Sequence, residues 1–157
     1  MRVLVIEKAA VKQNIRVVKR RAGGAAVYGV LSGDAGGAGI AEMAELLRAE
    51  GIGRFAVSEA EEAEALLRDL VEFGRGFNRP LDVGEAGALS ASLLWARGRK
   101  DEAVDALAEA LEALAPYGFF RVVADEGASV EPVLKSLAAR IARPGYDGPL
   151  ERGFVQE

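Results

Sequence analysis

The sequence predicts an α/β protein that continues into an all-α segment: three β-α units with a parallel sheet, then a helical hairpin. Two observations predict this class. In the first 73 residues, short apolar runs alternate with longer stretches whose apolar residues recur at helical spacing. Beyond residue 84, mainly helical spacing remains. Because strands that alternate with helices at this spacing favour parallel pairing with right-handed crossovers, we expect part of a β/α barrel or a similar sheet.

Each of the three expected β-α units has its own apolar pattern. The strand-like runs are residues 3–6, 25–31 and 54–57. The apolar stripes of the expected helices are Val11, Ile15 and Val18, then Ile40, Met43 and Leu47, then Ala63, Leu66, Leu67 and Leu70. Ser58 with Glu61 three residues later is a capping-box pattern for the third helix. We therefore place the α/β segment at residues 1–73.

The second half is expected to be helical. Residues 74–84 begin with GRGFNRP, which predicts a linker. A helical module follows at 85–142, with two helices on either side of a turn at Gly98 and small residues that allow close approach. These small residues are Ala103, Ala106 and Ala110. Ser129 is expected to cap a last helix, while residues 119–124 fit a strand or a helix. The prolines and glycines of residues 143–157 predict an irregular tail.

Composition excludes several kinds of chemistry. The 157 residues include no cysteine and no histidine, and the formal net charge is −4. Disulfides and thiolates are therefore excluded, and the commonest metal ligand and general base are missing, so we expect no metal site. No basic block is large enough to predict nucleic-acid binding by this chain alone. No apolar run approaches the roughly 20 residues of a membrane span, and a cytoplasmic location is the default expectation.

The glycine-rich segment 32–39 (SGDAGGAG) is the main candidate site. It lies between an expected strand and an expected helix, where backbone N–H groups can hold an anion. The candidate anion-binding or cofactor-binding residues are Ser32, Gly33, Asp34, Gly36, Gly37 and Gly39. Its spacing matches neither the dinucleotide fingerprint nor the P-loop. The alternative is a flexible turn in which Asp34 bonds its own loop backbone.

A second charged feature is the acidic cluster that opens the third expected helix. Its members are Glu59, Glu61, Glu62 and Glu64. Negative charge near a helix N-terminus is favourable, so we interpret the cluster as a solvated helix face. It is not expected to form a site.

Segments 14–15 (NI), 30–39 (VLSGDAGGAG) and 54–58 (RFAVS) occur in an order that identifies a known family. Residues 1–70 resemble the N-terminal part of the fold-type III pyridoxal-phosphate (PLP) alanine racemases. In that family a V-[VL]-K-[AG]-[ND]-A-Y-G-x-G motif supplies the lysine that binds PLP at the mouth of a β/α barrel. The resemblance places Ser32 at the lysine position, Gly36 at the tyrosine position and Ala38 at a position that is often histidine. Because serine cannot form an imine, the resemblance implies that the chain has no catalytic residues and no covalently held cofactor.

A second resemblance covers residues 86–138. Its segments are 93–103 (LLWARGRKDEA), 110–118 (ALEALAPYG) and 125–127 (DEG). They are similar to the last helical repeats of LuxR-type ATP-dependent transcriptional activators, which are tetratricopeptide-like (TPR-like). The resemblance implies a helical interaction module and favours a helix at residues 119–124.

Together these patterns lead to three functional hypotheses. The first is a noncatalytic interaction or regulatory protein whose partner is another protein or a second copy of the chain. The alternative is a PLP-binding alanine racemase-type isomerase that holds the cofactor noncovalently or has lost turnover. The third is a fragment of a regulator whose DNA-binding part lies elsewhere. The two resemblances leave open whether the chain is a natural fusion, a fragment or a constructed hybrid.

Overall fold

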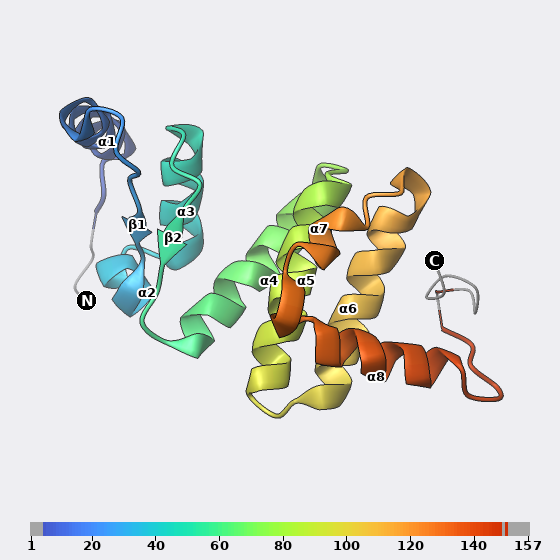
Figure 1. The fold of residues 1–157 in the computed structure, drawn as a ribbon. Helices are drawn as coiled ribbons and strands as arrows, with labels where there is room; N and C mark the ends of the chain where they lie inside the picture. Colours follow the sequence, from blue (N-terminus) through green and yellow to red (C-terminus); the bar gives the residue numbers. More distant parts are fainter. Residues whose placement is uncertain (1–4, 149, 151–157) are drawn as a thin grey trace. The chain divides into compact units, whose positions relative to one another are not determined.

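The chain folds as two units, which we describe separately. The structure is a computed structural model that describes residues 5–148 and 150 (Figure 1). The first unit comprises residues 1–66 and the second residues 67–157. The boundary falls within helix α4 (Ala60–Gly76).

The first unit contains a β-α-β arrangement with a small parallel sheet. Its elements are α1 (Lys8–Ala22), β1 (Gly29–Val30), α2 (Ser32–Gly37), α3 (Ile40–Ala49), β2 (Phe55–Ala56) and the first part of α4. The two strands pair in parallel, with Gly29 opposite Phe55 and Val30 opposite Ala56. The expected helices and the parallel pairing of the second and third runs are thus confirmed, with strands shorter than expected.

The first expected strand, residues 3–6, lies mainly outside the described residues. Within the described part of it, Val5 and Ile6 are not in a strand. The sheet therefore has two strands over the described residues. A helix-bearing α/β start is present, and a barrel remains a prediction.

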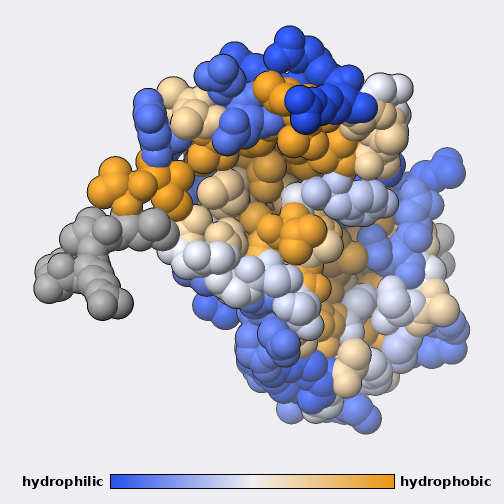
Figure 2. All heavy atoms as spheres, turned by 90° about the vertical axis from the view of Figure 1, so that its left-hand side faces the viewer, coloured by the Kyte–Doolittle hydropathy of each residue, from blue (hydrophilic) through white to orange (hydrophobic). Residues whose placement is uncertain are grey.

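The first unit buries a small set of apolar side chains and leaves others exposed. The buried members are Ile15, Leu31, Ala44, Leu46, Ile52 and Leu66. Val18 of α1, Tyr28 and Val30 of β1 are more than half exposed. Figure 2 shows hydrophilic residues over α1 at the top of this face and apolar surface below it. The two-stranded sheet thus leaves apolar surface uncovered, as an open sheet does.

The second unit is helical and is organised around a hairpin. Its elements are α5 (Pro80–Ala96), α6 (Lys100–Leu114), the 3-10 turn η1 (Ala115–Tyr117), α7 (Arg121–Ala124), the 3-10 turn η2 (Gly127–Ser129) and α8 (Glu131–Ile141). The predicted hairpin and its turn at Gly98 are confirmed. Residues 119–124 contribute the short helix α7, so the helical interpretation holds there.

Small residues bring α5 and α6 close together. A Cβ atom added at Gly87 would lie 2.7 Å from the Cβ of Ala110, and one added at Gly84 would lie 2.5 Å from a methyl carbon of Leu114. Both distances are shorter than any normal contact between carbon atoms. The glycines of α5 therefore take part in the close approach that the sequence assigned to the alanines of α6.

The prediction of an irregular linker at residues 74–84 is wrong, because most of this segment is helical. Helix α4 runs to Gly76 and α5 begins at Pro80, whose fixed backbone suits the first helical turn. Between them, Asn78 adopts a left-handed conformation with φ 51°. The N–H of Asn78 donates to the carbonyl of Arg75, and that of Arg79 to the carbonyl of Gly74. This Schellman-type cap makes the connection a tight corner between helices.

The Ser129 prediction also needs correction. Helix α8 begins at Glu131 with Val130 at the N-cap and has no side-chain cap. The hydroxyl of Ser129 instead donates to the carbonyl of Glu126, 2.8 Å away. Because the chain enters α8 from the 3-10 turn η2, Ser129 bonds backward to that turn.

The core of the second unit draws on all of its helices. Its most deeply buried large side chains are Leu107, Leu114, Val130, Val133 and Leu137. Trp95 packs against this cluster, as predicted for a lone tryptophan at a hairpin. Among the described residues, no helix is long and apolar enough to cross a membrane.

Candidate functional site

The glycine-rich segment forms a left-handed helical turn, α2, directly after β1. Residues 33–36 all have positive φ, between 54° and 71°. Asp34 and Ala35 are the two non-glycine residues in this run, and left-handed helix costs such residues roughly 1–2 kcal/mol each. The glycines at positions 33 and 36 carry no such penalty. The segment therefore has a specific left-handed backbone conformation, and glycine avoids the conformational strain at two of its four positions.

The N–H groups at the start of this turn bond an internal carboxylate, that of Glu62. Glu62 lies in the first turn of α4 and is partly buried. Its Oε1 atom accepts hydrogen bonds from the backbone N–H groups of Gly33 and Asp34, at 2.5 and 3.3 Å. Its Oε2 atom accepts from the N–H groups of Ser58 and Glu59, both at 3.3 Å. Four N–H groups from two elements thus converge on one carboxylate.

The environment of Glu62 lowers its pKa below the ordinary value for glutamate. Burial by itself raises the pKa, because it penalises the charged form. The four backbone hydrogen bonds act in the opposite direction and together outweigh it. Glu62 is consequently held as a carboxylate at neutral pH.

Asp34 serves the backbone of its own loop. Its Oδ1 atom accepts a hydrogen bond from the N–H of Ile40 at 2.8 Å, at the start of α3. Its backbone carbonyl accepts from the N–H groups of Ala38 and Gly39. Asp34 therefore connects the left-handed turn to the following helix. This agrees with the alternative that Asp34 bonds the backbone of its own loop, although the bond spans more residues than an Asx turn does.

The remaining candidates share this turn, but their contacts do not bring them together into one site. Ser32 begins the turn next to the fully buried Leu31. A Cβ added at Gly33, Gly36 or Gly37 would meet no other atom within 4 Å. At Gly39 it would meet the carboxylate of Glu42. The turn thus presents an open surface beyond the N–H groups that Glu62 bonds.

Sequence reasoning missed Glu62 and treated it as part of a solvated acidic face. The capping box was placed one residue too early, with Glu61 as the partner of Ser58. Because α4 begins at Ala60, Glu59 precedes its first residue and Glu62 occupies the third helical position, where a capping-box glutamate lies. The position of the helix start was the signal that could have identified it.

Comparison with known families connects this turn to the racemase resemblance. The alanine racemase N-terminal domain family matches residues 6–115, which is more than half of the chain. The chain belongs to this family. The match extends beyond residue 70, through α5 and α6, and so covers part of both units of the chain. Comparisons with curated proteins and with solved structures give no significant match.

The glycine-rich turn does not fit PLP held as an imine. Ser32, the residue that the resemblance puts at the lysine position, has no amine. The negative charge of Glu62 lies against the first two N–H groups of the turn, where it opposes a phosphate group. Among the described residues, no group of three or more acidic side chains could hold a metal ion.

Proposed function

We propose that the chain is a noncatalytic protein-interaction or regulatory member of the alanine racemase N-terminal domain family. The observation that carries the proposal is an exposed aromatic surface in the second unit. The catalytic alternative is weakened by the absence of an amine at Ser32 and by the carboxylate of Glu62 at the turn.

The aromatic surface lies at one end of the α5/α6 hairpin. Figure 1 shows that α5 begins and α6 ends at the same end of the hairpin, and Gly84 lies beside Leu114 there. The exposed apolar residues in the segments that flank this end are Phe77, Leu81, Tyr117, Phe119 and Phe120. The rings of Tyr117 and Phe119 stack with their centroids 5.6 Å apart. We call this set the aromatic end.

Exposure of several aromatic side chains together favours protein contact. Tyr117 is 50% exposed, Phe119 39% and Phe120 42%. Aromatic residues are enriched in the buried centres of protein interfaces, whereas isolated exposed apolar residues need no explanation. The TPR-like character of the hairpin is part of this proposal, and the close α5–α6 packing through Gly87 and Ala110 supports it.

The partner we propose is a second copy of the chain, bound through the aromatic end. Sedimentation velocity over a range of concentrations should show reversible association of the wild-type protein. The variant Phe119→Ser/Phe120→Ser should sediment as a monomer. Val30→Ser, which removes an apolar side chain that is 71% exposed in the first unit, is the matched control and should still associate. A wild-type chain that is monomeric throughout would overturn self-association.

The PLP-binding alternative is retained because the family match favours it. PLP titration followed by absorbance, with borohydride trapping on the same sample, separates it from the noncatalytic proposal. We expect no saturable binding at one site and no trapped adduct attributable to the turn. Saturable binding that Ser32→Lys converts into a trapped adduct would instead establish a surviving cofactor site.

A further inference from the structure

A cleft in the first unit lies at the N-terminal ends of β1 and β2, whereas the glycine-rich turn lies at the C-terminal end of β1. It has a volume of about 500 Å³. Its lining residues come from the end of α1, from segment 24–27 and from segment 51–54. These two segments precede β1 and β2, whereas the glycine-rich turn follows β1. The cleft is therefore separate from the racemase-like site.

The lining of the cleft is cationic. Its nine residues include two basic side chains, Lys19 and Arg54, and no acidic one. The partners of both cations are uncharged: Lys19 donates to the backbone carbonyl of Glu50, and Arg54 lies over the ring of Tyr28, 5.8 Å from its centroid. Neither of these two contacts is with a carboxylate.

Glu50, the acid that precedes the cleft residue Gly51 in the chain, is paired with a different residue. Arg16 donates to both carboxylate oxygens of Glu50, at 2.7 and 2.9 Å. This pairing is the main reason why the pKa of Glu50 is lowered and that of Arg16 is raised. A bidentate pair of this kind commits the carboxylate mainly to Arg16, and Lys19 makes only a smaller contribution to the lowered pKa of Glu50.

A further opposing charge comes from the carbonyl ends of α1 and α3, which both terminate near the cleft. These carbonyls are already bonded within the protein. The N–H of Gly51 donates to Arg48, that of Ile52 to Leu47, and that of Ala25 to Ala22. Capping of this kind satisfies the terminal carbonyls, and the two side-chain cations remain the stronger local charges.

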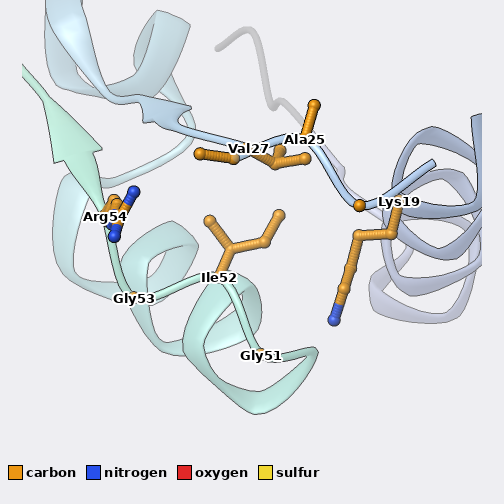
Figure 3. Close-up of a pocket in the computed structure, with 9 residues that line it drawn as sticks. Lys19, Ala25, Val27, Gly51, Ile52, Gly53 and Arg54 are labelled. Atoms are coloured by element: carbon orange, nitrogen blue, oxygen red, sulfur yellow. The ribbon is translucent and has the colours of Figure 1, made fainter. Parts of the chain in front are cut away.

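The arrangement within the cleft has two charged ends and an apolar middle. Figure 3 shows Arg54 and Lys19 at opposite ends of the view, with Val27 and Ile52 facing each other between them. Ile52 is only 5% exposed and gives this middle a fixed apolar floor. The geometry thus suits a short molecule that is negative at both ends.

We propose that this cleft binds a small organic dianion, with Lys19 and Arg54 each meeting one acidic group and Val27 and Ile52 contacting the carbon chain. Charge-assisted hydrogen bonds from lysine and arginine are the usual recognition elements for carboxylates. The proposal concerns a different surface from the aromatic end and from the glycine-rich turn.

The test is a titration of the full chain with succinate, followed by amide NMR shifts at constant ionic strength. We expect saturable shifts at Gly24, Ile52 and Gly53, and weaker binding of acetate, which has one carboxylate. Lys19→Met and Arg54→Met should each weaken succinate binding about fivefold, as expected for an exposed charge contact.

Arg21→Met is the matched control, because it removes an exposed cation of α1 that does not line the cleft. It should leave succinate affinity unchanged. The amide NMR spectrum of each variant is first compared with that of the wild type to check the fold. If Lys19→Met perturbs the fold, Arg54→Met alone tests the proposal. Absence of saturation, equal affinity for acetate and succinate, or equal loss in Arg21→Met would overturn the proposal.

Discussion

The two units differ in what holds them together. In the second unit, Leu107, Leu114, Val130, Val133 and Leu137 are almost completely buried in one cluster. In the first unit, Leu31 is the only described side chain among the largest fully buried ones. Burial of a large aliphatic side chain contributes about 1.5–3 kcal/mol. The second unit therefore rests on a larger and more completely buried hydrophobic core than the first unit.

The first unit depends more on polar contacts that join distant segments. Arg16 links α1 to Glu50 at the end of α3, and Glu62 links α4 to the left-handed turn α2. A surface ion pair such as Arg16–Glu50 contributes little, typically about 0–1 kcal/mol. The racemase-like turn therefore belongs to the less strongly stabilised unit, whereas the aromatic end lies on the more strongly stabilised one.

The sharpest test of this contrast is Leu107→Ala. Leu107 has no exposed surface, so its truncation should lower the free energy of unfolding of the second unit by about 2–5 kcal/mol. Urea denaturation followed by the fluorescence of Trp95, which packs against this core, measures the change. Leu81→Ala, at a side chain that is 45% exposed, is the control and should change stability much less. Similar losses in both variants would contradict a core centred on Leu107.

A second test concerns the close packing of α5 and α6. Gly87→Ala would place a methyl group 2.7 Å from the Cβ of Ala110, and overpacking of this kind costs about 1–3 kcal/mol. The better helix propensity of alanine offsets at most about 1 kcal/mol of that cost. Thermal unfolding followed by circular dichroism should show a net loss of about 1–2 kcal/mol.

Gly76→Ala is the matched control for Gly87→Ala. Gly76 is the last residue of α4, and an added Cβ would meet no atom within 4 Å. This change should be neutral or slightly stabilising. If Gly87→Ala were equally harmless, the two helices would have to be less closely packed than the structure shows.

The smallest expected effect is that of Glu62→Gln on the first unit. Because the folded-state pKa of Glu62 is lowered, its carboxylate stabilises the fold fully above the ordinary glutamate pKa of about 4.3. That stabilisation is lost as the pH falls through the lowered folded value. Glu62→Gln should therefore be less stable than wild type at neutral pH, and the difference should shrink in acid.

Amide hydrogen exchange at Gly33 and Asp34, measured as a function of pH, reads out this effect directly. Glu45→Gln removes an exposed carboxylate of α3 and serves as the control. If both variants exchanged alike at neutral pH, the carboxylate of Glu62 would not be what protects the N–H groups of the turn.

Several elements were predictable because their signals are local. The helical spacing of Val11, Ile15 and Val18 predicted α1, and the apolar stripes around Gly98 predicted the α5/α6 hairpin. The glycine, proline and asparagine of segment 74–84 were misinterpreted as a linker. The same residue types also build a helix C-cap and the first turn of the next helix, and composition does not distinguish these uses.

The sequence by itself determined most of the long helices, the parallel strand pairing, the absence of cysteine and histidine chemistry and the racemase-like order of segments. Only the tertiary structure decided that Glu62 bonds Gly33, which is 29 residues away, and that Lys19 and Arg54 line one cleft. The physical reason is that periodicity and capping act between residues a few positions apart. A converging set of N–H groups, or of charges, depends on which distant segments the fold brings together.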